Sequence, residues 1–155
     1  MKRLFILLTL ILISVFGIKN HQNQSEVVVP NTPTTSTTTH KVLSVIDGDT
    51  IIVEMDGVNE TVRLLGIDTP EVDPQYNPIE CYGREATNAT KEKLLNQTIT
   101  LETDPSQGRR DKFDRILAYI FLPDGTNINL FLIAEGFAKE YTYNKPYTYQ
   151  ADSPT

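Results

Sequence analysis

Acidic residues stand at two places where a turn or a strand end is expected, and together they could bind a metal. Asp47 and Asp49 flank Gly48 in the segment IDGDT, and the segment DTPE begins with Asp68 and ends with Glu71. Each segment taken alone is explained as a turn or as the end of a strand. If Asp49, Asp68 and Glu71 converge, however, their charges repel, and a divalent cation would relieve the repulsion. Oxygen ligands alone favour Ca²⁺ or Mg²⁺.

These acids do not form a continuous calcium-binding loop. They lack the alternating spacing and the final glutamate that an EF-hand loop requires. A metal would therefore be held between the two segments, and the backbone carbonyl of Thr69 could join the acids as a ligand.

Two arginines stand in segments that are otherwise apolar. Arg63 lies five positions before Asp68 and, because side chains alternate along a strand, shares a face with Leu65 and Ile67, which we expect to be interior. A buried arginine is unfavourable unless it is paired, so its partner should be the acidic cluster or an anionic ligand. Arg115 opens another apolar strand and can also point into a site. An ordinary salt bridge would explain either arginine alone.

Two guanidinium groups, a divalent metal and a spare carboxylate would suit phosphodiester hydrolysis. The cations would stabilise the charge that develops on the phosphate oxygens, and the carboxylate would activate water. Histidine chemistry is not expected in the folded part, because both histidines, His21 and His40, lie in the N-terminal region. Cys81 is the only cysteine, which excludes an internal disulfide and a cysteine-based zinc site.

The elements that must position these residues are short strands joined by tight turns. The sequence patterns predict strands at 41–46, 50–55, 60–67, 98–103 and 115–122 and helices at 83–97 and 129–138. This order predicts an α+β fold dominated by a five-stranded Greek-key OB-fold β-barrel with two to three helices. In such a meander, the turn at 47–49 and the end of the third strand lie at the same end of the sheet, so Asp49 and Asp68 can converge.

The first forty residues are expected to lie outside the folded domain. Lys2 and Arg3 precede an uncharged apolar run, so residues 1–18 are predicted to be a signal peptide or an N-terminal membrane anchor. The run is shorter than the ~20 residues that a membrane span needs. Residues 19–40 are rich in Thr, Ser and Pro and predict a linker. The domain at 41–155 is therefore expected to be secreted or held outside the membrane.

The net charge argues against a simple polyanion binder. The chain carries a formal charge of −6. From His40 onward there are 11 Lys and Arg against 19 Asp and Glu, a charge of −8. Proteins that bind nucleic acid through charge alone are basic, so such a function here would need a local cationic site or a metal.

Five segments together resemble one known family. VIDGDTIIV, VRLLGIDTPE, CYGREAT, DKFDRILAYI and LIAEGFAKEY occur in the order of the staphylococcal nuclease (thermonuclease) family and close to its spacing. The resemblance covers residues 41–146. It implies an OB-fold barrel with helices and the activity of a Ca²⁺-dependent phosphodiesterase, an endonuclease that acts on DNA and RNA.

The resemblance also implies roles for the acids and arginines discussed above. Asp49 and Asp68 match the calcium ligands, with the Thr69 carbonyl beside them. Arg63 and Arg115 match the two catalytic arginines that bind phosphate.

Further roles are carried over in the same way. Glu71 matches the candidate general base, and Asp47 matches an acid that supports the metal site from behind. Lys112 matches a lysine that contacts phosphate. Tyr141 or Tyr143 matches a tyrosine of the nucleotide pocket.

Three features depart from the family. Phe113 replaces a phosphate-binding tyrosine, the domain is acidic, and no helical pattern follows Lys145, where the family has a final helix. A non-catalytic nucleic-acid- or protein-binding module on the same fold and a Ca²⁺-binding structural domain are the alternatives to a nuclease. Non-catalytic binding modules should lose the acids or arginines, which are all present here. A monomer is expected.

Overall fold

The computed structural model describes residues 38–72, 80–143 and 145–154. The signal peptide or anchor expected at 1–18 lies outside these residues, as does the linker up to residue 37. Within the described part of the chain, no helix has the length and apolar character needed to cross a membrane.

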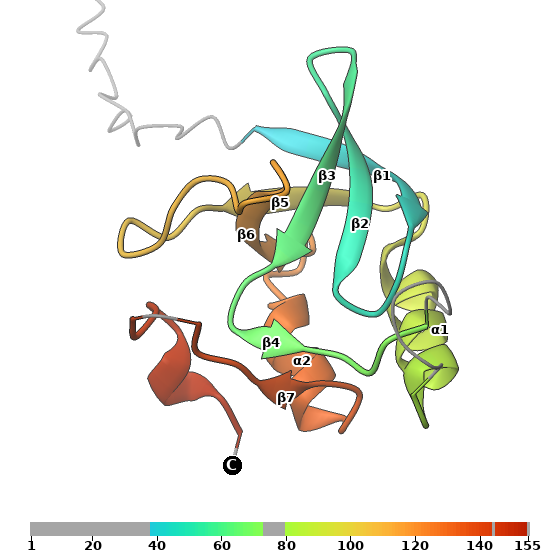
Figure 1. The fold of residues 1–155 in the computed structure, drawn as a ribbon. Coiled ribbons are helices and arrows are strands. Elements are labelled where there is room, and N and C mark those ends of the chain that lie inside the picture. Colours follow the sequence, from blue (N-terminus) through green and yellow to red (C-terminus); the bar gives the residue numbers. More distant parts are fainter. Residues whose placement is uncertain (1–37, 73–79, 144, 155) are drawn as a thin grey trace, which may run out of the picture. The chain divides into compact units, whose positions relative to one another are not determined.

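Five strands close into a barrel, as the sequence predicts (Figure 1). They are β1 (Thr39–Val45), β2 (Thr50–Met55), β3 (Val58–Leu64), β5 (Thr98–Glu102) and β6 (Ile116–Phe121). Their order around the barrel is β1-β2-β3-β6-β5, and only the β3–β6 pair is parallel. This arrangement confirms the predicted OB-fold barrel. β1 begins two residues before the expected domain boundary at 41.

The hairpin between β2 and β3 follows the predicted turn. Asp56 and Gly57 both have left-handed backbones, with φ of 53° and 79°, and Met55 pairs directly with Val58. A two-residue turn with two positive φ angles matches the twist of the flanking strands. Asp56 is therefore a turn residue rather than a ligand.

The third strand ends earlier than expected, and this changes the face that Ile67 occupies relative to Arg63. The chain leaves β3 at Leu64, turns through Gly66 (φ 75°), and forms a second short strand, β4 (Ile67–Asp68). Gly66 is needed here, because an added Cβ would lie 2.5 Å from the Tyr147 ring. The turn breaks the alternation, so Ile67 joins Leu64 in the barrel core while Arg63 faces a cleft. The prediction that Arg63 shares an interior face with Ile67 was wrong.

β4 pairs with a strand from the end of the domain. Its partner is β7 (Lys139–Glu140), and the two form a separate two-stranded sheet beside the barrel (Figure 1). The sequence analysis predicted neither of these short strands. Together they bring the end of β3 next to residues from the other end of the domain.

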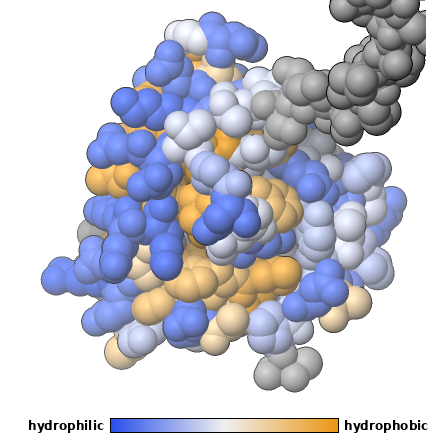
Figure 2. Space-filling view, turned by 180° about the vertical axis from the view of Figure 1, so that it is seen from behind, coloured by the Kyte–Doolittle hydropathy of each residue, from blue (hydrophilic) through white to orange (hydrophobic). Residues whose placement is uncertain are grey.

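Two helices complete the core. α1 (Gly83–Leu94) ends three residues before the prediction, because Leu95 is extended and Asn96 is left-handed ahead of β5. α2 (Ile128–Ala134) also ends early, and Gly136 follows it with φ of 76°. The helices contribute Leu94 and Leu132 to the barrel core. Seen from behind, hydrophobic residues gather in the lower half of the surface, and hydrophilic residues dominate elsewhere (Figure 2).

A second, smaller core holds the C-terminal segment against the barrel. Leu65, Tyr119 and Tyr147 form it, and the Tyr149 ring packs edge-on against Tyr119 with centroids 4.7 Å apart. After Tyr149 the chain makes a single 3₁₀ turn, Gln150–Asp152. The segment therefore lies against β6 and forms one wall of the cleft described next.

Candidate active site

A cleft of about 530 Å³ opens beside β3 and β4. Its walls come from β3 and β4, from the loop before β6, and from the segment after β7. The predicted site residues that line it are Arg63, Asp68, Lys112, Arg115, Tyr141 and Tyr143. The structure thus gathers six side chains from three separated parts of the chain into one space.

Asp49 does not line the cleft itself and is almost fully buried beside Arg63, which does. Only 5% of the surface of Asp49 is exposed. Its Oδ2 accepts hydrogen bonds from the backbone N–H (2.9 Å) and the hydroxyl (3.0 Å) of Thr69. Its Oδ1 accepts a hydrogen bond from the Thr50 hydroxyl at 3.1 Å. The turn before β2 and the end of β4 therefore meet, as the sequence predicts.

The close approach of these two segments depends on Gly48. A Cβ at this position would lie 2.7 to 2.8 Å from atoms of the Thr69 side chain. The Gly48 carbonyl also accepts a hydrogen bond from the Thr90 hydroxyl of α1 at 2.7 Å. The glycine of the IDGDT segment is thus required for packing, while the aspartates beside it remain available for chemistry.

Arg63 bridges the two acids. Its Nη2 lies 3.1 Å from Asp49 Oδ2 and 3.3 Å from Asp68 Oδ1. Its Nη1 donates to the carbonyls of Leu64 (2.9 Å) and Ile67 (3.0 Å). The largely buried arginine has therefore found the acidic partners that the sequence analysis expected for it.

The outer oxygen of Asp68 contacts a cation that the sequence analysis missed. Lys139 Nζ lies 3.0 Å from Asp68 Oδ2, because the β4–β7 register places the two residues opposite each other. The hydrogen bond that Lys139 donates to Asp68 raises the pKa of Lys139. The only available signal was the presence of Lys139 in the segment LIAEGFAKEY, since a two-residue strand has no detectable pattern.

The carboxylates of the site are incompletely compensated. Burial raises the pKa of Asp49 to about 6; the charge of Arg63 lowers it only in part, and the charge of Asp47 raises it further. Asp47 Oδ1 also accepts the backbone N–H of Asp49 at 3.1 Å. Glu71 is exposed, and partial burial together with the charges of Asp49 and Asp68 raises its pKa. These carboxylates therefore share one region of negative potential.

The residues present fit a hard divalent cation. Asp49 and Asp68 contact the same guanidinium nitrogen, so one cation already lies between them. Both ligands are oxygen donors, which suit Ca²⁺. Among the described residues, however, no three acidic, histidine or cysteine side chains come together closely enough to hold a metal. A cation would therefore be held by Asp49 and Asp68 together with neutral oxygen ligands; Asp68 also pairs with Lys139, and Glu71 is exposed.

Arg115 lines the cleft from the loop before β6, the strand next to β3, and is held by an aspartate of its own loop. Its Nε and Nη2 both lie 2.7 Å from Asp111 Oδ2. Asp111 Oδ1 accepts the backbone N–H groups of Phe113 (2.9 Å) and Arg115 (3.0 Å). Burial opposes the shift, but these hydrogen bonds hold the pKa of Asp111 below its usual value. The sequence analysis missed Asp111, although its spacing from Arg115 in DKFDR was a usable signal.

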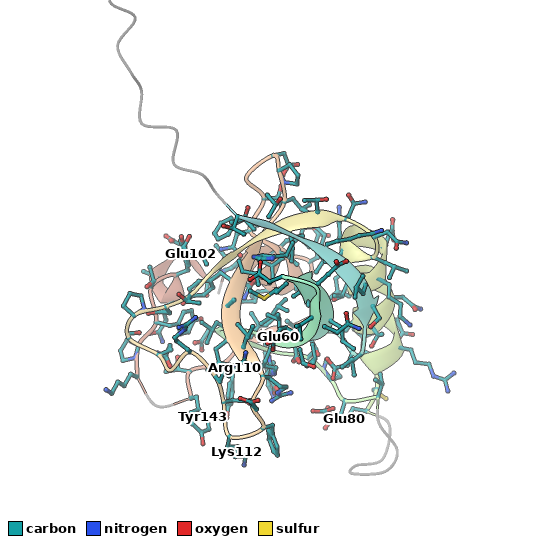
Figure 3. The ribbon with its side chains drawn as sticks, turned by 90° about the horizontal axis from the view of Figure 1, so that it is seen from above. Glu60, Glu80, Glu102, Arg110, Lys112 and Tyr143 are labelled. Atoms are coloured by element: carbon teal, nitrogen blue, oxygen red, sulfur yellow. The ribbon has the colours of Figure 1, made fainter. Side chains whose placement is uncertain are left out.

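The open side of the cleft combines cationic and aromatic side chains. Phe113 is 68% exposed, and its ring lies 4.9 Å from Lys112 Nζ and 5.4 Å from Arg115 Cζ. The rings of Tyr141 and Tyr143 are 6.4 Å apart. Lys112 and Tyr143 project on the same side of the barrel (Figure 3). This surface could bind an anionic chain that also carries flat rings.

Comparisons with known proteins agree with this geometry. Residues 61–153 match the family model described as Staphylococcal nuclease homologue. The chain is 43% identical over 112 residues to a protein named Thermonuclease from Staphylococcus hyicus, covering 72% of this chain and 64% of that protein. It is 46% identical over 99 residues to the Thermonuclease of Staphylococcus intermedius, covering 64% and 57%.

A relative from another genus is also similar. Endonuclease YncB of Bacillus subtilis is 38% identical over 107 residues, covering 69% of this chain and 50% of that protein. The chain thus spans between one half and two thirds of the length of these three relatives.

Proposed function

The chain belongs to the staphylococcal nuclease homologue family, and we propose that it is a Ca²⁺-dependent nuclease that hydrolyses phosphodiester bonds of DNA and RNA. One observation carries this proposal. A single cleft is lined by Arg63, which bridges two carboxylates, and by Arg115, from the loop that leads into the neighbouring strand β6. The names of the relatives, thermonuclease and endonuclease, support the same reaction.

The two arginines, which line the same cleft, would together bind and stabilise the phosphate. Asp111 holds Nε and Nη2 of Arg115, and Nη1 has no hydrogen-bond partner among the described residues. Arg63 is held by two carboxylates and two carbonyl groups, so its orientation is set before substrate arrives. Donors that are already oriented stabilise developing charge without reorganisation.

Asp49 and Asp68 are the residues that would hold the metal, with the Thr69 carbonyl as a further oxygen ligand. Bound Ca²⁺ would offset the charge of these acids and polarise a phosphate oxygen. Asp47 contributes from behind, because its carboxylate fixes the backbone N–H of Asp49.

Glu71 is the residue best suited to accept a proton from the attacking water. It is exposed at the start of the loop after β4, and its raised pKa brings it closer to the range in which a general base works. On the substrate side, Lys112 would contact a phosphate, while Tyr141 and Tyr143 would line the nucleotide pocket.

The site of action is proposed to be outside the cell membrane. The apolar segment at 1–18 and the Thr-rich linker at 19–40 support a secreted or surface-tethered protein. Fusing residues 1–40 to a reporter enzyme tests this part separately. Reporter activity that stays inside the cells would contradict it.

The nuclease proposal is tested by incubating the purified chain with DNA and with RNA. Cleavage should require Ca²⁺, stop with EDTA and return when Ca²⁺ is added in excess. Intact substrate over a range of Ca²⁺ and salt concentrations would contradict the proposal. Binding without cleavage would instead favour the non-catalytic module. Arg115→Ala serves as the inactive control, since it should fold normally and cut poorly.

A further inference from the structure

The loop of residues 109–115, which we call the arginine loop, carries part of the proposed substrate surface. Lys112, Phe113 and Arg115 all line the cleft from it. Asp111 folds the loop on itself by accepting two backbone N–H groups and the Arg115 side chain. These bonds define the shape of the loop, and the Leu117 N–H, which donates to the Arg109 carbonyl, ties the start of the loop to β6.

One ion pair connects this loop to a neighbouring barrel strand. Arg110 Nη1 and Nη2 each donate to a different carboxylate oxygen of Glu60, both at 2.9 Å. Glu60 lies on β3, where its register opposite Val53 of β2 fixes it. Among the described residues, this pair is the only ion pair or hydrogen bond between the arginine loop and residues outside 109–117.

The same guanidinium also holds the end of the loop. Arg110 Nη1 donates to the Asp114 carbonyl at 2.6 Å, one residue before Arg115. Asp114 has a left-handed backbone with φ of 66°, a conformation that non-glycine residues rarely adopt without support. Arg110 therefore joins a fixed barrel strand to the residue that sets the direction of Arg115.

We propose that Glu60 and Arg110 are positioning residues that set the arginine loop, and with it Arg115, against the substrate. The inference rests on the proposed nuclease function. A bidentate pair between arginine and carboxylate fixes orientation as well as distance, so it suits this task (Figure 3). An exposed pair of this kind contributes little to overall stability, so its main effect falls on the loop.

The test uses Glu60→Gln, Arg110→Lys and the double variant, each assayed for kcat/KM on a DNA oligonucleotide. Glu60→Gln removes a negative charge, which by itself would favour a polyanionic substrate. Arg110→Lys keeps its charge but cannot form the two parallel bonds. Charge alone therefore predicts no loss from either variant, whereas positioning predicts that kcat/KM falls about fivefold in both. The double variant should fall no further than the single variants, because the pair acts as a unit.

A matched control separates positioning from charge and from stability. Glu54→Gln makes the same charge change at an exposed site on β2 and should leave kcat/KM unchanged. The thermal midpoints of all variants should stay near that of the wild type. Unchanged kcat/KM in Glu60→Gln and Arg110→Lys would overturn the proposal, as would losses that simply add in the double variant.

Amide hydrogen exchange tests the pair without any cleavage. The Asp111 N–H donates to the Arg115 carbonyl, and the Leu117 N–H donates to the Arg109 carbonyl, both at 3.0 Å. These two amides should exchange about fivefold faster in Glu60→Gln than in the wild type. Their exchange rates should be unchanged in Glu54→Gln. If Glu60→Gln shows this faster exchange while the wild-type chain cleaves no DNA, the nuclease function is contradicted and the positioning role of the Glu60–Arg110 pair is retained. Equal exchange rates in Glu60→Gln and Glu54→Gln would overturn the positioning role of the Glu60–Arg110 pair.

Discussion

Two aspartates in different regions of the molecule are almost equally buried, yet their pKa values shift in opposite directions. Asp49 in the candidate site is 5% exposed, and Asp104 beside the C-terminal segment is 4% exposed. The pKa of Asp104 lies well below its usual range, although burial opposes this shift. Its carboxylate accepts hydrogen bonds from the Tyr119 hydroxyl (2.6 Å) and from the backbone N–H groups of Thr148 (2.7 Å) and Ser106 (2.8 Å).

Asp49 has a less favourable environment. Burial raises its pKa to about 6, and the charge of Asp47 adds to the effect, while Arg63 and Thr69 offset only part of it. The comparison distinguishes a structural acid from a site acid. The protein itself satisfies the charge of Asp104, and it leaves the charge of Asp49 with a deficit that an added cation can fill.

The largest expected effect comes from removing the guanidinium of Arg63, which pairs with Asp49. Arg63→Ala should lower kcat about 100- to 1000-fold, as the loss of an oriented donor does. It should also lower the free energy of unfolding by about 3 kcal/mol, because it leaves a buried carboxylate unpaired. Steady-state cleavage assays and urea unfolding measure the two effects.

Arg115→Ala is the matched variant for this experiment. Its guanidinium is more exposed and pairs with Asp111, which also accepts backbone N–H groups. A similar loss of kcat is therefore expected with little loss of stability. Equal destabilisation by both substitutions would contradict the distinction between the buried acid side of the site and its exposed loop.

The second prediction concerns the structural acid. Asp104→Asn should lower the free energy of unfolding by about 2 kcal/mol at pH 7, because hydrogen bonds in the folded protein stabilise the ionised carboxylate of Asp104. A depressed pKa stabilises the fold above the ordinary value of 3.8, and this stabilisation is lost as the pH falls below it. Urea unfolding at pH 7 and at pH 3 should therefore show the difference between wild type and variant shrinking at acid pH. A constant difference would show that the charge is not involved.

The third prediction is that the same substitution at Asp49 has the opposite effect on the free energy of unfolding. A raised pKa means that ionisation opposes folding, so the contribution of Asp49 is favourable below pH 3.8 and is lost as the pH rises through about 6. In EDTA at pH 8, Asp49→Asn should therefore unfold with a free energy about 2 kcal/mol higher than that of the wild type. The gain should disappear near pH 3. The same variant should be inactive with Ca²⁺, and a loss of stability at pH 8 would refute the assignment of an under-compensated acid.

The contrast also shows what the sequence could predict. The barrel followed from alternating strands and from turns such as Asp56–Gly57, and the meeting of Asp49 with the DTPE segment followed from that topology. The place of Ile67 relative to Arg63 did not, because the turn at Gly66 packs against the distant Tyr147 ring.

The ion pairs that the sequence did not predict were missed for a similar reason. Lys139 reaches Asp68 through strands of only two residues, which leave no periodic pattern. Glu60 and Arg110 are 50 positions apart, and only the closed barrel brings them together. Local patterns therefore predicted the elements and the conspicuous acids, while contacts between distant segments required the structure.

The smallest expected effect concerns Phe113, on the exposed side of the comparison. Phe113→Tyr would add a hydroxyl on the cleft wall, next to Lys112 and Arg115. One added hydrogen bond to a phosphate should strengthen binding by about 0.5–1.5 kcal/mol, so KM should fall about two- to tenfold while kcat changes little. Stability should not change, because the side chain is 68% exposed. Because this surface, unlike the region around Asp49, has no buried charge to compensate, a large change in the free energy of unfolding would contradict the division between the two regions.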